Sequence, residues 1–251
     1  MTSLRGLLRR RAQLVGCFQN IPAPESTEAM AFAGVDFVIV DTEHGLIGDE
    51  QIGVLLRAAE TTGIAPIVRL ANADGPRIGR LLDAGLAGIM VAHVRSAAEA
   101  EQIVSATRYP PLGHRSAAGS RVTGFGRRTS MTEFVDSDAA EPAVIAMIED
   151  RVGVDNASAI AGTDGVDALF VGTSDLGMDV GARGRPDHPD VANGVNVVCG
   201  AAESHGISAG LPLPADADVA AAFESGATFV ATSDVFALMS GLERFGSREK
   251  E

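Results

Sequence analysis

The chain has 251 residues, of which 46% are hydrophobic, so it can bury a sizeable core in one large α/β domain or barrel and is not disordered by default. It carries 20 Lys and Arg against 33 Asp and Glu, which gives a net charge of −13. A surface this acidic repels phosphate backbones and anionic membranes, so neither nucleic acid nor a membrane is expected as a partner.

The N-terminal segment and the cysteines predict a cytoplasmic protein. The first residues are basic, but no apolar stretch follows them, and no run approaches the roughly 20 residues that span a bilayer. Cys17 and Cys199 form no C-x-x-C or metal-ligand pattern. A reducing cytosol is the simplest compartment for such a chain.

Short apolar runs bounded by Gly, Asp or Pro recur along the chain, as in the strands of a buried parallel sheet. The predicted strands are Leu14–Phe18, Phe37–Asp41, Pro66–Leu70, Gly88–Ala92, Val144–Glu149, Ala168–Val171, Ile207–Leu211 and Phe229–Ala231. The charge-bearing segments between them are predicted as helices, for example Asp49–Thr61, Gly75–Ala84 and Ala97–Thr107.

Eight strand–helix units in about 250 residues predict a single (β/α)8 TIM barrel over residues 1–251. A doubly wound open sheet is the alternative. No G-x-G-x-x-G follows a strand, which weakens a dinucleotide-binding interpretation. The stretch from Tyr109 to Asp138 is longer than an ordinary connection and rich in Gly, Arg, Ser and Pro. Long loops inside compact domains are often functional.

Polar residues at the carboxyl ends of barrel strands are the candidates for chemistry, because TIM-barrel sites lie there. Four predicted strands end in or lead to such residues: Asp41, Glu43 and His44; Arg69; Glu149; and Asp175.

Each of these residues also has an ordinary structural interpretation. Asp175 could cap the following helix, Arg69 could pair with a carboxylate, and a lone His44 is more often structural than catalytic. Their coincidence at one rim favours a site. Side chains alternate along a strand, so Met147 and Glu149 share a face.

These residue types permit a specific chemistry. The carboxylates of Glu149 and Asp175, with no Cys or His pair nearby, suit a hard divalent cation that polarises a 2-oxo acid and stabilises its enolate. Arg69 adds a permanent positive charge beside an oxyanion. His44 is the natural proton shuttle, and Asp83 is a plausible partner for its other ring nitrogen. The sole lysine is Lys250 at the C-terminus, so a Schiff-base aldolase is excluded.

In order and spacing, a set of short motifs resembles the HpcH/HpaI aldolases, metal-dependent pyruvate aldolases built on a TIM barrel. The resemblance runs from about Leu14 to about Leu242. The motifs are Asp41-x-Glu43-His44-Gly45, Val68-Arg69, Leu81-Leu82-Asp83-x-Gly85, the segment Ala106–Pro111 with Gly113 and Arg115, Ile148-Glu149, Val171-Gly172-x-x-Asp175-Leu176, and Gly226-Ala227-x-Phe229-Val230.

The resemblance implies a role for each matching residue. Glu149 and Asp175 would bind the metal (Mg²⁺, Mn²⁺ or Co²⁺), and His44 would be the acid/base with Asp83 behind it. Arg69 would contact substrate oxygens. Asp41 and Met147 would support the metal and substrate without binding them directly. The substrate would be bound by four further residues: Gly172, Thr173, Ser174 and Leu211. Its carboxylate would meet the N-terminus of a helix, which suits an anion.

The activity implied is cleavage of a 4-hydroxy-2-oxo acid to pyruvate and an aldehyde, and the reverse reaction. The assembly implied is a homohexamer, a trimer of dimers, with C-terminal helices exchanged between dimer partners. The alternatives are a related lyase acting on an acyl-CoA ester or oxaloacetate, and a barrel that binds a 2-oxo acid without catalysis. For such a lyase, several arginines of the 109–138 loop could meet a phosphate-bearing or dicarboxylate substrate. They could equally form a solvated or subunit-contact surface. These arginines are Arg115, Arg121, Arg127 and Arg128.

The sequence departs from the family pattern at three places. Met147 replaces a glutamine two residues before the metal-binding glutamate. His93 replaces a proline after the fourth strand, and we interpret it as a structural or surface histidine, with a second acid/base as the alternative. The Gly-x-Arg-Gly loop reads Gly113 to Ser116, and this loop is expected to help shape the pocket for the aldehyde.

Overall fold

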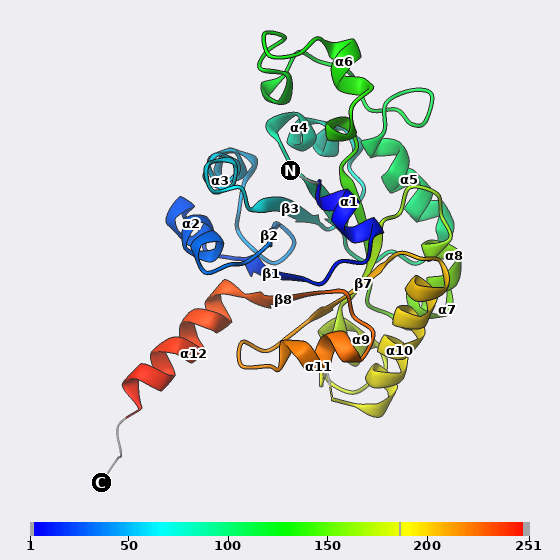
Figure 1. Ribbon diagram of the computed structural model, residues 1–251. Coiled ribbons are helices and arrows are strands. Elements are labelled where there is room, and N and C mark those ends of the chain that lie inside the picture. The colour runs from blue at the N-terminus through cyan, green and yellow to red at the C-terminus, as the bar shows by residue number, and fades with distance from the viewer. Residues whose placement is uncertain (1–2, 186, 248–251) are drawn as a thin grey trace.

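The structure is a closed barrel of eight parallel strands in sequential order, in which β8 returns to pair with β1 (Figure 1). This computed structural model describes residues 3–185 and 187–247, so Lys250 lies outside the described residues. The strands are β1 (Leu14–Gln19), β2 (Phe37–Asp41), β3 (Ala65–Leu70), β4 (Gly88–Val91), β5 (Ala143–Ile148), β6 (Ala168–Val171), β7 (Ser208–Pro212) and β8 (Phe229–Ser233). The predicted barrel is confirmed, and each strand lies within two residues of its predicted bounds.

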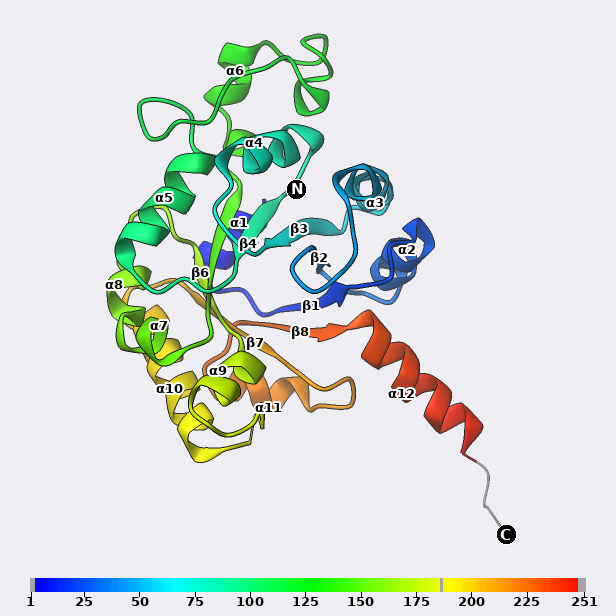
Figure 2. The same ribbon diagram turned by 180° about the vertical axis from the view of Figure 1, so that it is seen from behind.

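Helices surround the barrel and alternate with its strands (Figure 2). In the described residues they are α1 (Leu4–Arg9), α2 (Pro24–Phe32), α3 (Asp49–Thr62), α4 (Gly75–Ala84), α5 (Ala97–Thr107), α6 (Met131–Val135), α7 (Arg151–Asp155), α8 (Ala157–Ala161), α9 (Thr173–Asp179), α10 (Pro189–Ser204), α11 (Val219–Glu224) and α12 (Asp234–Gly246). Asp74 and Ser96 cap α4 and α5, which explains why the predicted bounds of these two helices hold. No helix in the described ranges is long and apolar enough to cross a membrane.

The interior of the barrel is filled by large side chains from alternating strand positions. The Phe170 and Phe229 rings lie 5.6 Å apart, and Gly210 makes room for them, since a Cβ there would come within 2.4 Å of Phe229. The same alternation places Ile67 and Met147 in this interior cluster. It therefore also turns Arg69, two residues beyond Ile67, toward the barrel axis.

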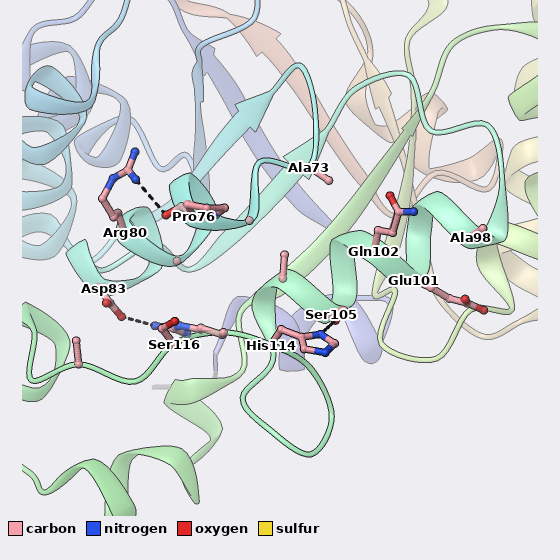
Figure 3. A pocket seen from close by; sticks show the side chains of 15 residues that line it. Ala73, Pro76, Arg80, Asp83, Ala98, Glu101, Gln102, Ser105, His114 and Ser116 are labelled. Carbon is pink, nitrogen blue, oxygen red and sulfur yellow. Dashed lines mark hydrogen bonds and ion pairs between the residues drawn. The ribbon is translucent and has the colours of Figure 1, made fainter.

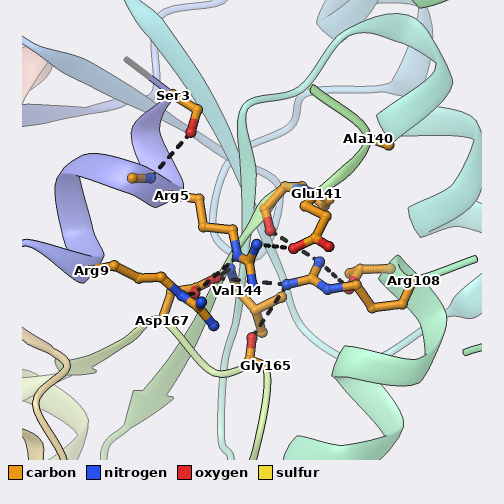
Figure 4. A network of polar contacts seen from close by, with 12 residues as sticks. Ser3, Arg5, Arg9, Arg108, Ala140, Glu141, Val144, Gly165 and Asp167 are labelled. Carbon is orange, nitrogen blue, oxygen red and sulfur yellow. Dashed lines mark hydrogen bonds and ion pairs between the residues drawn. The ribbon is translucent and has the colours of Figure 1, made fainter. Parts of the chain in front are cut away.

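Helix α1 closes the N-terminal end of the barrel through a network of arginines around one buried carboxylate (Figure 4). The Nε atoms of Arg5 and Arg9 donate to Asp167 Oδ1 at 3.2 and 2.9 Å, and Val144 N donates to Asp167 Oδ2 at 3.0 Å. Arg108 lies 3.8 Å from the same carboxylate. Burial, together with the charge of Arg5, lowers the pKa of Arg108 to about 10.

Replacing this carboxylate should destabilise the barrel strongly. Asp167→Asn leaves the surrounding arginines without their buried counter-charge, so we expect the free energy of unfolding to fall by about 3 kcal/mol. Urea denaturation followed by circular dichroism measures this change. The exposed neighbour provides the control, because Asp164→Asn should stay within about 0.5 kcal/mol of the wild type. Equal stability of the two variants would mean that α1 is held by its apolar contacts alone.

The long loop between α5 and β5 lies at the N-terminal end of the barrel, opposite the rim that carries the candidate site. Arg115 Nη2 donates to Asp83 Oδ1 at 2.8 Å, and Arg121 Nη1 donates to the carbonyl of Ala84 at 3.1 Å. Both partners lie at the C-terminal end of α4, which runs antiparallel to the strands. The expectation that residues 113–116 shape the aldehyde pocket is therefore wrong within one chain, because an α-to-β connection emerges at the other end of the barrel.

Candidate active site

The salt bridge between Asp41 and Arg69 organises the rim of the barrel. The two residues lie side by side in β2 and β3, and Arg69 Nε and Nη2 donate to Asp41 Oδ1 and Oδ2 at 2.9 and 2.6 Å. Asn20 Nδ2 and the backbone N–H groups of Glu43 and His44 also donate to this carboxylate. Burial favours the protonated acid, but the hydrogen bonds and charge of Arg69 hold the pKa of Asp41 below its usual value.

Arg69 is held against an apolar wall as well. Its guanidinium carbon lies 4.9 Å from the centre of the Phe18 ring, and Nη1 lies 3.8 Å from Met147 Sδ. Because Met147 carries no amide, this wall offers Arg69 a soft contact where a glutamine would offer a strong acceptor. Asp41 and Met147 thus both contact Arg69.

Glu149 follows β5 and places a carboxylate in a fully buried position. Its Oε1 accepts the backbone N–H of His93 at 2.7 Å, whereas its Oε2 accepts no hydrogen bond from a described residue. Gly172 makes this position possible, because a Cβ there would come within 2.4 Å of Glu149 Oε2. Burial raises the pKa of Glu149 to about 7, and the negative charges of Glu43 and Asp175 act in the same direction, against the hydrogen bond and charge of His93. A buried carboxylate with an unpaired oxygen and acidic neighbours fits a divalent cation.

The rim residues open into a cavity of about 320 Å³ at the mouth of the barrel. Its walls include most of the predicted substrate-side residues: Asp41, His44, Arg69, Met147, Gly172, Thr173, Ser174 and Asp175. Leu211 is not among them, and its predicted contact with the substrate is wrong for this structure. Side chains alternate along β7, so Leu211 packs outward into the core under the helices while Pro212 and Leu213 line the cavity.

His44 stands at the edge of this cavity without the partner that the sequence predicts. Its side chain is 60% exposed, and its Nε2 lies 4.0 Å from Glu43 Oε2. Asp83 instead accepts a hydrogen bond from Arg115 at the C-terminal end of α4. Because α4 runs antiparallel to β3, Asp83 lies at the far end of the barrel, and the predicted pairing of Asp83 with His44 is wrong within one chain.

Asp83 and Arg115 belong to a larger and separate cavity, of about 1020 Å³, between α4 and α5 (Figure 3). Its walls are helical residues and the segment around His114, which hydrogen-bonds Ser105. This cavity is larger than the one at the barrel rim, but it is not the candidate reaction site. The buried Glu149 carboxylate and the Asp41–Arg69 salt bridge both lie at the rim.

Comparisons with known proteins show the family of this chain. The sequence profile of the HpcH/HpaI aldolase/citrate lyase family matches residues 14–238. The chain belongs to this family. It is 35% identical over 239 residues to 5-keto-4-deoxy-D-glucarate aldolase of Escherichia coli, covering 94% of this chain and 92% of the relative.

Solved structures of the HpcH/HpaI family resemble the whole barrel. An HpcH/HpaI aldolase from Desulfitobacterium hafniense DCB-2 superposes with a TM-score of 0.89 at 32% identity, over 98% of this chain and 95% of that one. The citrate synthase SbnG superposes with a TM-score of 0.85 at 32% identity, over 98% and 96% of the two chains. The prediction of a carbon–carbon lyase of the aldolase type is confirmed.

One cluster at the rim of this HpcH/HpaI member was not predicted from the sequence. Glu43, His93 and Glu149 offer ligand atoms that all lie within 4.8 Å of one another. Glu43 was predicted as a charged residue of the rim without a role of its own, and a structural or surface role was favoured for His93. The signal that could have found the cluster is the replacement of a proline by a titratable residue directly after β4, one strand away from Glu149.

Proposed function

We propose that this chain cleaves 4-hydroxy-2-oxo acids into pyruvate and an aldehyde, and catalyses the reverse condensation, with a divalent cation bound at the barrel rim. The observation that carries the proposal is the buried Glu149 carboxylate beside the Asp41–Arg69 salt bridge, whose Oε2 accepts no hydrogen bond from residues 3–185 or 187–247. Mg²⁺, Mn²⁺ and Co²⁺ all accept such oxygen ligands.

Glu149 and Asp175 are proposed to hold the cation. Asp175 lies in the first turn of α9, lines the cavity, and is close enough to Glu149 for its charge to raise the pKa of that carboxyl. When bound, the cation supplies Lewis acidity, which polarises the 2-oxo carbonyl of the substrate and stabilises the pyruvate enolate that cleavage releases.

The side chains of the chain bind the substrate and move its protons. Arg69 binds Asp41 through Nε and Nη2. Its Nη1, which lies beside Met147 and 3.4 Å from Glu43 Oε2, is the nitrogen proposed to meet a substrate oxygen. The first residues of α9, Thr173 and Ser174, receive the substrate carboxylate. In the cleavage direction, His44 takes the proton of the C4 hydroxyl as the C3–C4 bond breaks, and a proton returned to C3 then gives pyruvate.

The acceptor is proposed to be a polar aldehyde. The Escherichia coli relative is named for a sugar dicarboxylate, and aldol cleavage of such a compound to pyruvate leaves an aldehyde that carries a carboxylate. An acyl-CoA ester or oxaloacetate is the alternative substrate, and it draws support from the similarity to the citrate synthase SbnG. A barrel that binds a 2-oxo acid without turnover is the non-enzymatic alternative.

Deuterium exchange into the methyl group of pyruvate tests enolate chemistry without the aldehyde. In D2O, the metal-loaded protein should catalyse exchange that NMR detects, EDTA should abolish it, and added Mg²⁺ or Mn²⁺ should restore it. Metal binding is verified separately by calorimetry. Absence of exchange with the metal demonstrably bound would refute the proposal and favour an acyl-CoA lyase or a non-catalytic binder.

The chain is proposed to form a homo-oligomer, a hexamer built as a trimer of dimers, in the cytoplasm. Helix α12 projects from the end of β8 away from the barrel in both views (Figures 1 and 2). It exposes a set of large apolar side chains: Phe236, Leu238, Met239, Leu242 and Phe245. Such a surface is unfavourable in water, and the α12 helix of a partner chain is its proposed cover. Cys17 and Cys199 are both buried free thiols, which suits a reducing compartment.

Charges on this helix face should break the assembly. The double variant Leu242→Glu and Phe245→Glu is expected to show a smaller mass than the wild type by light scattering coupled to size-exclusion chromatography, because buried unpaired charges oppose association. Glu224→Gln, on the exposed surface of α11, is the control and should keep the wild-type mass. An unchanged mass in the double variant would exclude α12 from the interface.

A further inference from the structure

The His93 side chain bridges two carboxylates at the rim of the barrel. Its Nδ1 lies 3.0 Å from Glu149 Oε1, and its Nε2 lies 3.1 Å from Glu43 Oε1. A neutral imidazole has one N–H group and one bare nitrogen, so it can donate to only one of these carboxylates. The other contact then needs either a second proton, on the ring or on a carboxylate, or a cation between the groups.

The same two carboxylates each leave an oxygen without a donor. Glu149 is fully buried at its side chain and Glu43 is 8% exposed, yet neither Oε2 atom accepts a hydrogen bond from a described residue. Arg69 Nη1 lies 3.4 Å from Glu43 Oε2, a charge contact that does not meet hydrogen-bond geometry, and the other two nitrogens of this guanidinium bind Asp41. Buried carboxylate oxygens without donors are costly, and a bound cation removes that cost.

The backbone holds the imidazole in this position. His93 has a φ of 57°, a left-handed conformation that few residues other than glycine adopt. Its neighbours are fixed to the adjacent strands, because Ala92 N donates to Leu70 O and Val94 N donates to Met147 O. A strained residue fixed on both sides commonly marks a functional position.

We propose that His93 is a ligand of the divalent cation, so that Glu43, His93 and Glu149 together form a site with carboxylate oxygens and one imidazole nitrogen. One ring nitrogen binds the cation, and the other remains hydrogen-bonded to a carboxylate, the arrangement that usually orients a metal-bound imidazole. The inference rests on the proposed function in that Glu149 holds the metal in both, and Glu43 and His93 are added to Glu149 and Asp175 as ligands of the same cation.

An imidazole ligand changes which cation the chain prefers. All-oxygen sites suit Mg²⁺, whereas a nitrogen ligand favours first-row transition ions such as Co²⁺ and Zn²⁺. The wild-type chain should therefore bind Co²⁺ much more tightly than Mg²⁺. Removing the imidazole should weaken Co²⁺ binding and leave Mg²⁺ binding little changed.

His93→Gly is the matched variant. Glycine accepts a φ of 57° without strain and keeps the backbone N–H that donates to Glu149, so only the imidazole is lost. By isothermal titration calorimetry, we expect Co²⁺ affinity to fall by about 10- to 100-fold. Free imidazole added to the variant should recover part of this affinity, because it can occupy the space left by the side chain.

Pulsed electron paramagnetic resonance on the Mn²⁺-loaded protein reads the ligand directly. The wild type should show nitrogen modulation from a coordinated imidazole, His93→Gly should lose it, and His44→Gln should retain it. Equal Co²⁺ affinity of wild type and His93→Gly would overturn the proposal, as would nitrogen modulation that survives in His93→Gly. Neither measurement needs turnover, so failure of pyruvate exchange would refute the proposed function without affecting this result.

Discussion

Glu149→Gln is expected to abolish metal-dependent deuterium exchange into pyruvate, with a rate loss of about 10³-fold or more. Glutamine has nearly the shape of glutamate and keeps a carbonyl oxygen for the backbone N–H of His93. It lacks the negative charge that the cation requires. The effect should therefore fall on metal binding and on the chemistry that the metal supports, and not on the fold.

The stability of this variant shows whether the lost exchange comes from lost metal binding or from a damaged fold. Burial raises the pKa of Glu149 to about 7, so above that pH the folded metal-free protein carries a buried charge that glutamine does not. Glu149→Gln should then be at least as stable as the wild type without metal. At about 100 times the dissociation constant, metal should stabilise the wild type by about 2.7 kcal/mol and the variant by much less.

Thermal unfolding with and without Mn²⁺ measures this difference. Glu101→Gln, on the exposed face of α5, is the matched control and should keep both the exchange rate and the stabilisation by metal. If Glu149→Gln retained full exchange after chelation and re-addition of metal, the assignment of Glu149 as a metal ligand would be wrong.

The barrel and the identity of its rim residues follow from local sequence patterns. Strands buried on both faces produce apolar runs, and alternation within a strand is enough to place Arg69 and Met147 on the inner face. The prediction that Leu211 contacts the substrate came from the resemblance alone. Side-chain alternation along β7 was not applied to it, and this alternation turns Leu211 outward into the core under the helices. Where strand alternation was used, the side chains lie on the predicted face of the strand.

Interactions between distant segments were less predictable. The pairing of Asp83 with His44 does not form within one chain, because helix direction puts the end of α4 at the opposite end of the barrel, where Arg115 binds Asp83. The placement of residues 113–116 at the aldehyde pocket is wrong within one chain for the same reason. The approach of His93 to Glu43 and Glu149 depends on a left-handed backbone that no periodic pattern signals. Such contacts are fixed by tertiary packing and not by propensity.

His44→Gln is expected to lower the rate of exchange and of aldol cleavage by about 10²- to 10⁴-fold, the usual contribution of a positioned acid/base. The imidazole lines the cavity and is 60% exposed, so it can reach a substrate hydroxyl while exchanging protons with water. Its backbone N–H is anchored by Asp41 at 3.3 Å, and glutamine keeps that anchor. Metal affinity should be unchanged, because His44 is not in the proposed ligand set.

His114→Gln is the matched control, since His114 is an exposed histidine that hydrogen-bonds Ser105 at the other cavity. It should keep the wild-type rate. If His44→Gln kept full activity, proton transfer would have to pass to another group at the rim, and His93 is the next imidazole there. The double variant His44→Gln and His93→Gly then decides the matter. A loss of rate at saturating metal in the double variant, but not in His93→Gly alone, would assign the proton transfer to His93, and no loss would assign it to water in the open cavity.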